Sequence, residues 1–280
     1  MTQPAEGAPR AAPKRPWRPS LFQASQWAVH AAALLLLLLM PAAWAWAVAI
    51  VLCSQLALMA ASLLPRNTWL GANVVRLPDT AARRGEVAIT IDDGPDPEVT
   101  PQVLAILARY GAVATFFCIG SRAQKHPELC RSMQAAGHHI ENHGARHPTL
   151  CALSGPAGWH REIAEGQDIL HRITGRAPRF YRAVAGLRNP FLDPVLHRCG
   201  VRLASWTRRG FDTREANPDT VLQRLTQGLK GGDILLLHDG HAARTPDGDA
   251  VIVQVLPKLL EQLHKQGLTP VTLEQACKPD

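Results

Sequence analysis

The chain has 280 residues, enough for one large domain or two small ones, and its formal net charge is +7. Its six cysteines lie far apart without a CxxC pair, which excludes a zinc ribbon and a dense disulfide framework and favours a reducing compartment. Residues 1–25 are predicted to form a disordered basic tail, with its charges on Arg10, Lys14, Arg15 and Arg18. Aromatic residues do not alternate with these basic ones, so we expect a membrane-proximal segment and no nucleic-acid partner.

Between Arg18 and Arg66 the chain is largely apolar and contains no charged residue. A bilayer core is spanned by about 20 helical residues, so this stretch is long for one span and about right for two. Pro41 interrupts it, and tryptophans, which prefer the membrane interface, mark its ends and its middle: Trp27, Trp44, Trp46 and Trp69. We therefore predict a transmembrane segment over residues 26–65, preferably a helical hairpin. A single kinked span is the alternative, whereas a cleaved signal peptide would be shorter and carry a cleavage site.

The basic tail predicts the orientation of this segment in the plasma membrane, because basic flanks stay cytoplasmic. Two spans would return the rest of the chain to the cytoplasm, and one span would place it outside. Residues 66–84 are polar and contain prolines and a glycine, as expected for a linker.

Residues 85–280 alternate between strand-like and helix-like segments, which indicates parallel βα units. The predicted strands are residues 86–91, 114–120, 138–142, 179–183, 201–206, 233–239 and 269–273. The predicted helices are residues 101–111, 126–137, 159–175, 191–200, 218–232 and 251–267. This series predicts an α/β fold, a small distorted (β/α)7-type barrel that follows the membrane segment.

Polar residues follow several predicted strands, where catalytic groups of βα folds gather. They are Asp92, Asp93, His143, His147, Arg182, Asp212 and His238. His143 and His147 are four residues apart, so on a helical turn both rings would face the same way. Two imidazoles and one carboxylate form a three-ligand metal site with open positions. Of the adjacent acids Asp92 and Asp93, one would be a ligand and the other a general base, which also relieves their mutual repulsion.

The chain resembles the polysaccharide deacetylases of carbohydrate esterase family 4 over roughly residues 85–275. The resemblance is carried by five motifs in the family order, TIDDGP, HGARHP, RAVAG, WTRRGFDT and LLLHD. It implies a metal-dependent hydrolase that removes an acetyl or other small acyl group from the nitrogen of an amino sugar. The divalent metal would most commonly be zinc, with cobalt or nickel possible.

The resemblance also implies a role for each matching residue. Asp93, His143 and His147 would bind the metal. Asp92 would be the catalytic base, held ionised by Arg182. His238, paired with Asp212, would protonate the departing amine. A backbone N–H near Ala185 would bind the oxyanion, and Leu236 and Trp206 would contact the substrate.

Two departures from the family pattern concern the substrate more than catalysis. The usual Arg-Pro-Pro-Tyr-Gly segment is replaced by residues 182–186, Arg-Ala-Val-Ala-Gly, which removes a large polar side chain from the cleft. Gly144 stands where a Ser or Thr usually follows the first metal histidine, which could loosen the metal loop. His241 follows the last motif closely enough to reach the site, but a surface position is favoured.

The predicted function is therefore a membrane-anchored deacetylase whose partners are the lipid bilayer and an N-acylated amino sugar. A cytoplasmic domain would act on a lipid-linked saccharide, and an external one on a glycan such as peptidoglycan. The alternative is a catalytically impaired glycan-binding or scaffold protein that retains the barrel, a hypothesis motivated by the altered third motif.

Overall fold

The computed structural model describes residues 16–278. Eight parallel strands form one curled sheet in the order β5-β4-β3-β2-β1-β7-β6, with β8 paired to the start of β1. The strands are β1 (Glu86–Asp92), β2 (Thr115–Cys118), β3 (His139–Asn142), β4 (Phe180–Tyr181), β5 (Arg202–Leu203), β6 (Arg208–Arg209), β7 (Ile234–His238) and β8 (Thr269–Val271). No pairing joins β5 to β6 among these strands, so the barrel stays open there.

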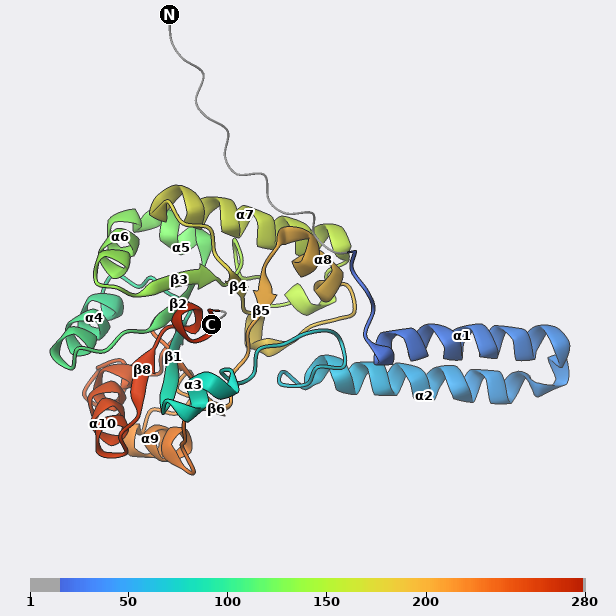
Figure 1. Ribbon diagram of the computed structural model, residues 1–280. Helices are drawn as coiled ribbons and strands as arrows, with labels where there is room; N and C mark the ends of the chain where they lie inside the picture. Colours follow the sequence, from blue (N-terminus) through green and yellow to red (C-terminus); the bar gives the residue numbers. More distant parts are fainter. Residues whose placement is uncertain (1–15, 279–280) are drawn as a thin grey trace, which may run out of the picture.

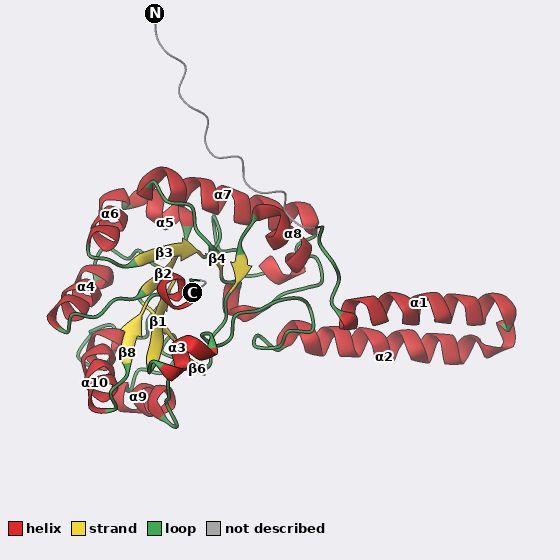
Figure 2. Cartoon of the chain, viewed as in Figure 1, coloured by secondary structure: helices red, strands yellow, loops and turns green. Residues whose placement is uncertain are grey.

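Most helices cover the outer side of the sheet, as Figure 2 shows, and two short ones pack inside the curl. They are α3 (Asp79–Arg83), α4 (Val99–Arg109), α5 (Gly120–Lys125), α6 (Pro127–Ala135), α7 (Pro156–Thr174), α8 (Leu192–Cys199), α9 (Pro218–Thr226), α10 (Val251–Lys265) and α11 (Leu273–Ala276). The predicted α/β half-barrel is thereby confirmed. The sequence analysis missed β6, α3, α5 and α11, all of which are six residues or shorter.

Two apolar layers hold this arrangement together. Outside the sheet, α10 turns one face inward, and its buried residues repeat at helical spacing: Val251, Ile252, Val255, Leu256, Leu259, Leu260 and Leu263. Inside the curl, a smaller cluster is built around Phe117, Trp206 and Leu236. β1 lies between both layers, and six of its seven residues are buried. The end of β1 is therefore held rigidly, which fixes the position of the two aspartates.

Two long apolar helices precede the barrel and form an antiparallel hairpin that projects from it (Figure 1). They are α1 (Leu21–Leu39) and α2 (Trp44–Leu63), joined by the 3-10 turn η1 (Pro41–Ala43) that begins at the predicted interruption. Both are long and apolar enough to cross a membrane, and most of their surface is exposed. Most of the predicted basic tail lies outside the described residues, and α1 already begins at Leu21.

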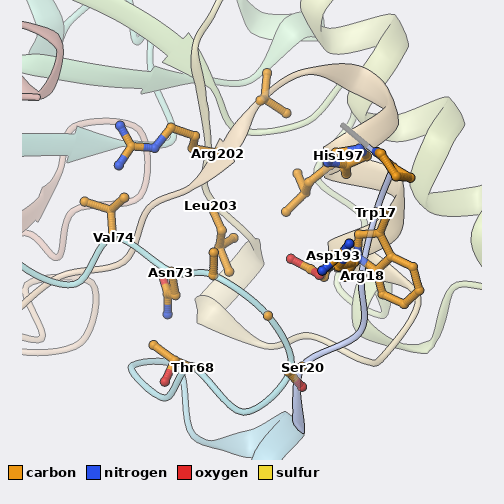
Figure 3. Close-up of a pocket in the computed structure, with 15 residues that line it drawn as sticks. Trp17, Arg18, Ser20, Thr68, Asn73, Val74, Asp193, His197, Arg202 and Leu203 are labelled. Atoms are coloured by element: carbon orange, nitrogen blue, oxygen red, sulfur yellow. Dashed lines mark hydrogen bonds between the residues drawn. The ribbon is translucent and has the colours of Figure 1, made fainter. Parts of the chain in front are cut away.

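The base of the hairpin is attached to the barrel by side-chain contacts. Trp17, just before α1, donates its indole N–H to Asp193 of α8 at 2.7 Å. This contact borders a cavity of about 570 Å³ between the start of the hairpin, the linker and β5 (Figure 3). At the other end, the Arg188 N–H donates to the Ser62 carbonyl of α2 at 3.3 Å. Both ends of the hairpin are thus tied to the same side of the barrel.

Candidate active site

The two aspartates end β1 and reach one cavity because the backbone turns between them. Asp92 is the last residue of β1, and Asp93 has a left-handed conformation with φ of 75°. Successive strand residues would point to opposite faces, but this turn redirects the Asp93 side chain. Aspartate adopts the left-handed region more readily than most residues. Asp92 and Asp93 are 3% and 5% exposed, respectively, so both carboxylates are largely removed from water.

Three side chains converge as the sequence predicted for a metal site. The Oδ1 of Asp93 lies 3.2 Å from the Nε2 of His143 and 3.2 Å from the Nε2 of His147. The expected helical turn is absent here, because His143 and His147 lie on a loop after β3, with His147 at φ of 58°. The folded loop brings the two imidazole rings together, with their centroids 4.7 Å apart.

The chemistry of these three groups fits a divalent cation. The Oδ1 of Asp93 is buried and has no hydrogen-bond partner among the described residues, so a ligand position is open. His143 donates its Nδ1–H to the Arg182 carbonyl at 2.8 Å, which turns its Nε2 towards Asp93. Burial and the neighbouring His143 lower the pKa of His147 to about 4, so its ring is neutral near pH 7, as a ligand must be.

Glu162 of α7 holds the loop that carries the two histidines. Its Oε1 accepts the backbone N–H of Arg146 at 2.7 Å and that of His147 at 2.8 Å. A Cβ at Gly144, where φ is 91°, would lie 2.6 Å from the same oxygen. The glycine therefore makes room for the carboxylate, and the loop is not loosened as the sequence had suggested. The sequence did not predict this role, because a single glutamate on a helix, such as Glu162, forms no recognisable motif.

We expect Gly144→Ala to destabilise the protein by about 1–3 kcal/mol, because the new methyl group strains the backbone and displaces Glu162. The control is Gly111→Ala, where φ is 59° but the methyl group would meet nothing within 4 Å. The free energy of unfolding from urea titrations measures the difference. An equal loss in both variants would show that the contact with Glu162 is unimportant.

Asp92 is paired with a buried arginine. The Nη1 of Arg182 donates to the Oδ1 of Asp92 at 2.7 Å and to the hydroxyl of Thr90 at 2.7 Å. The Nη2 of Arg182 donates to the Ser205 carbonyl at 2.8 Å, and its guanidinium lies 4.0 Å from the ring of Phe117. Burial lowers the pKa of Arg182, while Asp92 opposes that shift. This ion pair fixes the orientation of the Asp92 carboxylate.

A second polar pair joins His238, at the end of the neighbouring strand β7, to Asp212 in the loop after β6. Asp212 accepts the Nδ1–H of His238 at 2.9 Å and the His238 backbone N–H at 2.7 Å. Burial favours the neutral ring, but the charge and hydrogen bond of Asp212 outweigh it and raise the pKa of His238 to about 9. His238 is therefore protonated near pH 7 and can serve as an acid.

The predicted residues surround a cavity of about 210 Å³. Its walls include Asp92, Asp93, His143, His147, Ala185, Trp206, Leu236 and His238. Arg182 and Asp212 lie behind this wall and act through Asp92 and His238. Ala185 has φ of 53° and lies exposed at the rim, in the 3-10 turn η3 (Val184–Gly186).

One residue of this site was missed from the sequence, and another was expected mainly at the surface. The Nδ1 of His241 lies 2.9 Å from the Oδ2 of Asp93, although its ring is 51% exposed. Both expectations for His241 are met, because it lies at the surface and its short spacing from His238 lets it reach the site. Arg209, at the end of β6, also lines the cavity. Its strand has only two residues and was not predicted, so no signal pointed to it.

A half-open barrel with two histidines and an aspartate beside a second, arginine-held carboxylate is the arrangement expected of a metal-dependent hydrolase. The comparisons with known proteins agree with this class. The family described as polysaccharide deacetylase matches residues 79–204. A peptidoglycan-N-acetylglucosamine deacetylase of Bacillus cereus is 34% identical over 194 residues, covering 69% of this chain and 88% of the relative. The chain belongs to the polysaccharide deacetylase family, carbohydrate esterase family 4.

A further relative and two solved structures are also similar to this chain. A chitooligosaccharide deacetylase of Azorhizobium caulinodans is 35% identical over 158 residues, covering 56% of this chain and 75% of the relative. The crystal structure of a peptidoglycan N-acetylglucosamine deacetylase superposes with a TM-score of 0.66 and 30% identity, covering 73% of this chain and 92% of the other. A family pseudoenzyme from Bacillus anthracis has a TM-score of 0.65 at 19% identity, covering 74% and 69%, and this likeness concerns the fold alone.

Proposed function

We propose that this chain is a membrane-anchored, metal-dependent hydrolase that removes an N-acetyl group, or another small N-acyl group, from an amino sugar in a glycan or lipid-linked saccharide. The observation that carries this proposal is that Asp92, Asp93, His143, His147 and His238 all line one cavity. The relatives named above as deacetylases support the reaction type.

In this proposal Asp93, His143 and His147 hold a divalent cation, most commonly zinc, with cobalt or nickel as alternatives. Bound there, the cation supplies Lewis-acid polarisation of the acyl group. Asp92, oriented by its hydrogen bond from Arg182, takes a proton from the water whose oxygen adds to the acyl carbon. The backbone N–H near Ala185 stabilises the oxyanion, and Trp206 and Leu236 position the sugar.

The same proposal gives His238 the second half of the reaction. Its raised pKa keeps a proton available, which it delivers to the nitrogen as the carbon–nitrogen bond breaks. The products are acetate and the free amine of the sugar. Asp212 stabilises the protonated ring and thus sets the pH range in which this step operates.

The Asp212–His238 pair predicts a pH dependence. The pKa of His238 is raised to about 9, so the acid is present below that pH and is lost as the pH rises through it. In Asp212→Asn, burial is no longer opposed by the carboxylate, and the pKa of His238 falls. We expect the basic limb of kcat against pH to move down by about 2 units or more. An unchanged basic limb would contradict the role given to this pair.

The alternative is a catalytically impaired glycan-binding or scaffold protein, motivated by the change at residues 182–186. The complete ligand and acid–base set around one cavity favours the enzyme. Acetate release from N-acetylated chito-oligosaccharides, together with metal analysis of the purified chain, separates the two functions. A chain that binds these oligosaccharides but releases no acetate at any metal loading would contradict the proposed hydrolase.

The hairpin of α1 and α2 supports the membrane anchor, since both helices are long and apolar enough to span a bilayer. A hairpin places its two ends on the same side, so a cytoplasmic N-terminus implies a barrel that faces the cytoplasm. We expect a C-terminal alkaline phosphatase fusion to be inactive and a C-terminal green fluorescent protein fusion to fluoresce. An active phosphatase fusion would instead place the barrel outside, as a single span predicts.

A further inference from the structure

A second cavity adjoins the active site and leads to the membrane hairpin. It has a volume of about 750 Å³ and shares Ala185, Trp206 and Arg209 with the catalytic cavity. Its far end is formed by Leu63 and Leu64, where α2 ends. We call this space the arginine groove, because its lining contains four arginines and no acidic residue: Arg66, Arg208, Arg209 and Arg224.

Two of these arginines are already neutralised within the protein. Arg208 forms an ion pair with Asp233 at 2.6 Å, and Arg224 lies 3.3 Å from Glu215. Arg66 is exposed and donates one hydrogen bond, to the Thr207 carbonyl at 2.8 Å. Its charge has no acidic partner in the part of the chain that the structure describes. The groove therefore carries positive charge that these residues leave uncompensated.

Arg209 lies at the junction of the groove and the catalytic cavity. Its guanidinium lies 5.5 Å from the ring of Trp206 and 4.9 Å from the ring of Phe211. It forms no hydrogen bond or ion pair with residues 16–278, and its buried Nε has no partner there. An arginine held between two rings with unsatisfied donors is suited to bind a phosphate or another oxyanion.

The surface around the groove indicates where such an anion comes from. Outside the hairpin, the large apolar side chains exposed in the described chain are Trp69, Leu150, Leu153, Phe191 and Phe211. All five line cavities shared with the hairpin or directly contact α1: Phe22 of α1 lies 5.6 Å from Trp69, Phe191 borders a cavity with Trp27, and Phe211 lines the arginine groove with Leu63. Leu150 and Leu153 border a cavity with α2. These side chains form an apolar belt at the base of the hairpin, beside two helices that are long and apolar enough to cross a membrane.

We propose that the natural substrate is an N-acylated amino sugar carried on a membrane lipid through a phosphate, and that Arg209 binds this phosphate. Arg66 contributes charge further along the arginine groove, and the lipid chain follows Leu63 and Leu64 into the bilayer. The sugar then lies in the catalytic cavity beside Trp206. This inference rests on the proposed deacetylase function and specifies its substrate.

The test uses the full-length protein in detergent and three N-acetylglucosamine probes. The first is linked to farnesol through a phosphate, the second is a farnesyl glycoside without phosphate, and the third is soluble N-acetylglucosamine 1-phosphate. Acetate release gives kcat and KM for each probe. We expect kcat/KM for the phosphate-linked lipid to exceed that of either other probe by at least about tenfold.

Arg209→Gln is expected to raise KM for the phosphate-linked lipid and to reduce its preference over the neutral glycoside to about threefold or less. Arg209→Lys should restore part of this preference, because it keeps the charge without the planar fork. The control is Arg172→Gln, which removes an exposed arginine from α7 and should leave the preference unchanged.

Each contrary outcome has one meaning. If the neutral glycoside is hydrolysed as well as the phosphate-linked lipid, the phosphate inference is wrong, while the released acetate still supports the hydrolase. If the soluble sugar phosphate is equally good, the lipid source is wrong. If neither these probes nor N-acetylated chito-oligosaccharides release acetate, the proposed function itself fails.

Discussion

Asp92→Asn is expected to lower kcat for acetate release by a factor of about 100 to 10,000. Asn has the size of Asp but cannot take a proton from the attacking water. Its side-chain oxygen can still accept a hydrogen bond from Arg182, which now lies 2.7 Å from the carboxylate. Since the substrate contacts remain, KM should change little. The measurement is steady-state acetate release by the full chain in detergent.

Two controls separate lost chemistry from lost structure. The metal content of Asp92→Asn should equal that of the wild type, because Asp92 is not among the three grouped ligands. Glu98→Gln makes the same acid-to-amide change on an exposed side chain near the same motif and should alter kcat less than about twofold. A variant of Asp92 that retains more than a tenth of the wild-type kcat would contradict its role as the base.

His147→Ala is expected to reduce the bound divalent metal from one per chain to a small fraction, and to lower activity by at least about 100-fold. The variant loses one of three ligand atoms, and the remaining two cannot complete the site. His147 is better suited to this test than His143, which is almost fully buried and also bonded to Arg182. Metal analysis by mass spectrometry after dialysis gives the stoichiometry without depending on activity.

The matched control for His147→Ala is His160→Ala, which removes an exposed histidine from α7. It should keep both the metal and the activity. Addition of excess zinc to His147→Ala should restore activity only in part, because the affinity rather than the fold is lost. Full metal stoichiometry in His147→Ala after dialysis would show that the cation lies elsewhere.

The fold and most of the residues that line the cavity could be predicted from the sequence, because both depend on regular secondary structure. Parallel strands place their carboxyl ends on one rim, so polar residues that follow them meet. Asp93, His143 and His147 indeed meet at one point. Strand β1 and helix α10 could be predicted because their apolar residues recur with the spacing of a strand and of a helix, respectively.

The remaining features could not be predicted because they depend on irregular backbone. The i, i+4 spacing of His143 and His147 suggested a helical turn, but the chain folds into a loop in which His147 has positive φ. The function of Glu162 comes from a contact across 15 residues to that loop. Arg209 lies on a two-residue strand, too short for a periodic pattern. Such positions are defined by tertiary packing rather than by local preference.

The contact between Arg188 and the end of α2 joins the hairpin to the barrel. Arg188 is 2% exposed, its backbone N–H donates to Ser62, and its side chain donates to the Oδ1 of Asn67 at 2.7 Å. Removal of the chain up to Arg66 would take away the Ser62 carbonyl that accepts the Arg188 backbone N–H. The hairpin is thus fixed to the barrel by direct contacts, and in the proposed membrane anchor these contacts would set the distance between the catalytic cavity and the bilayer.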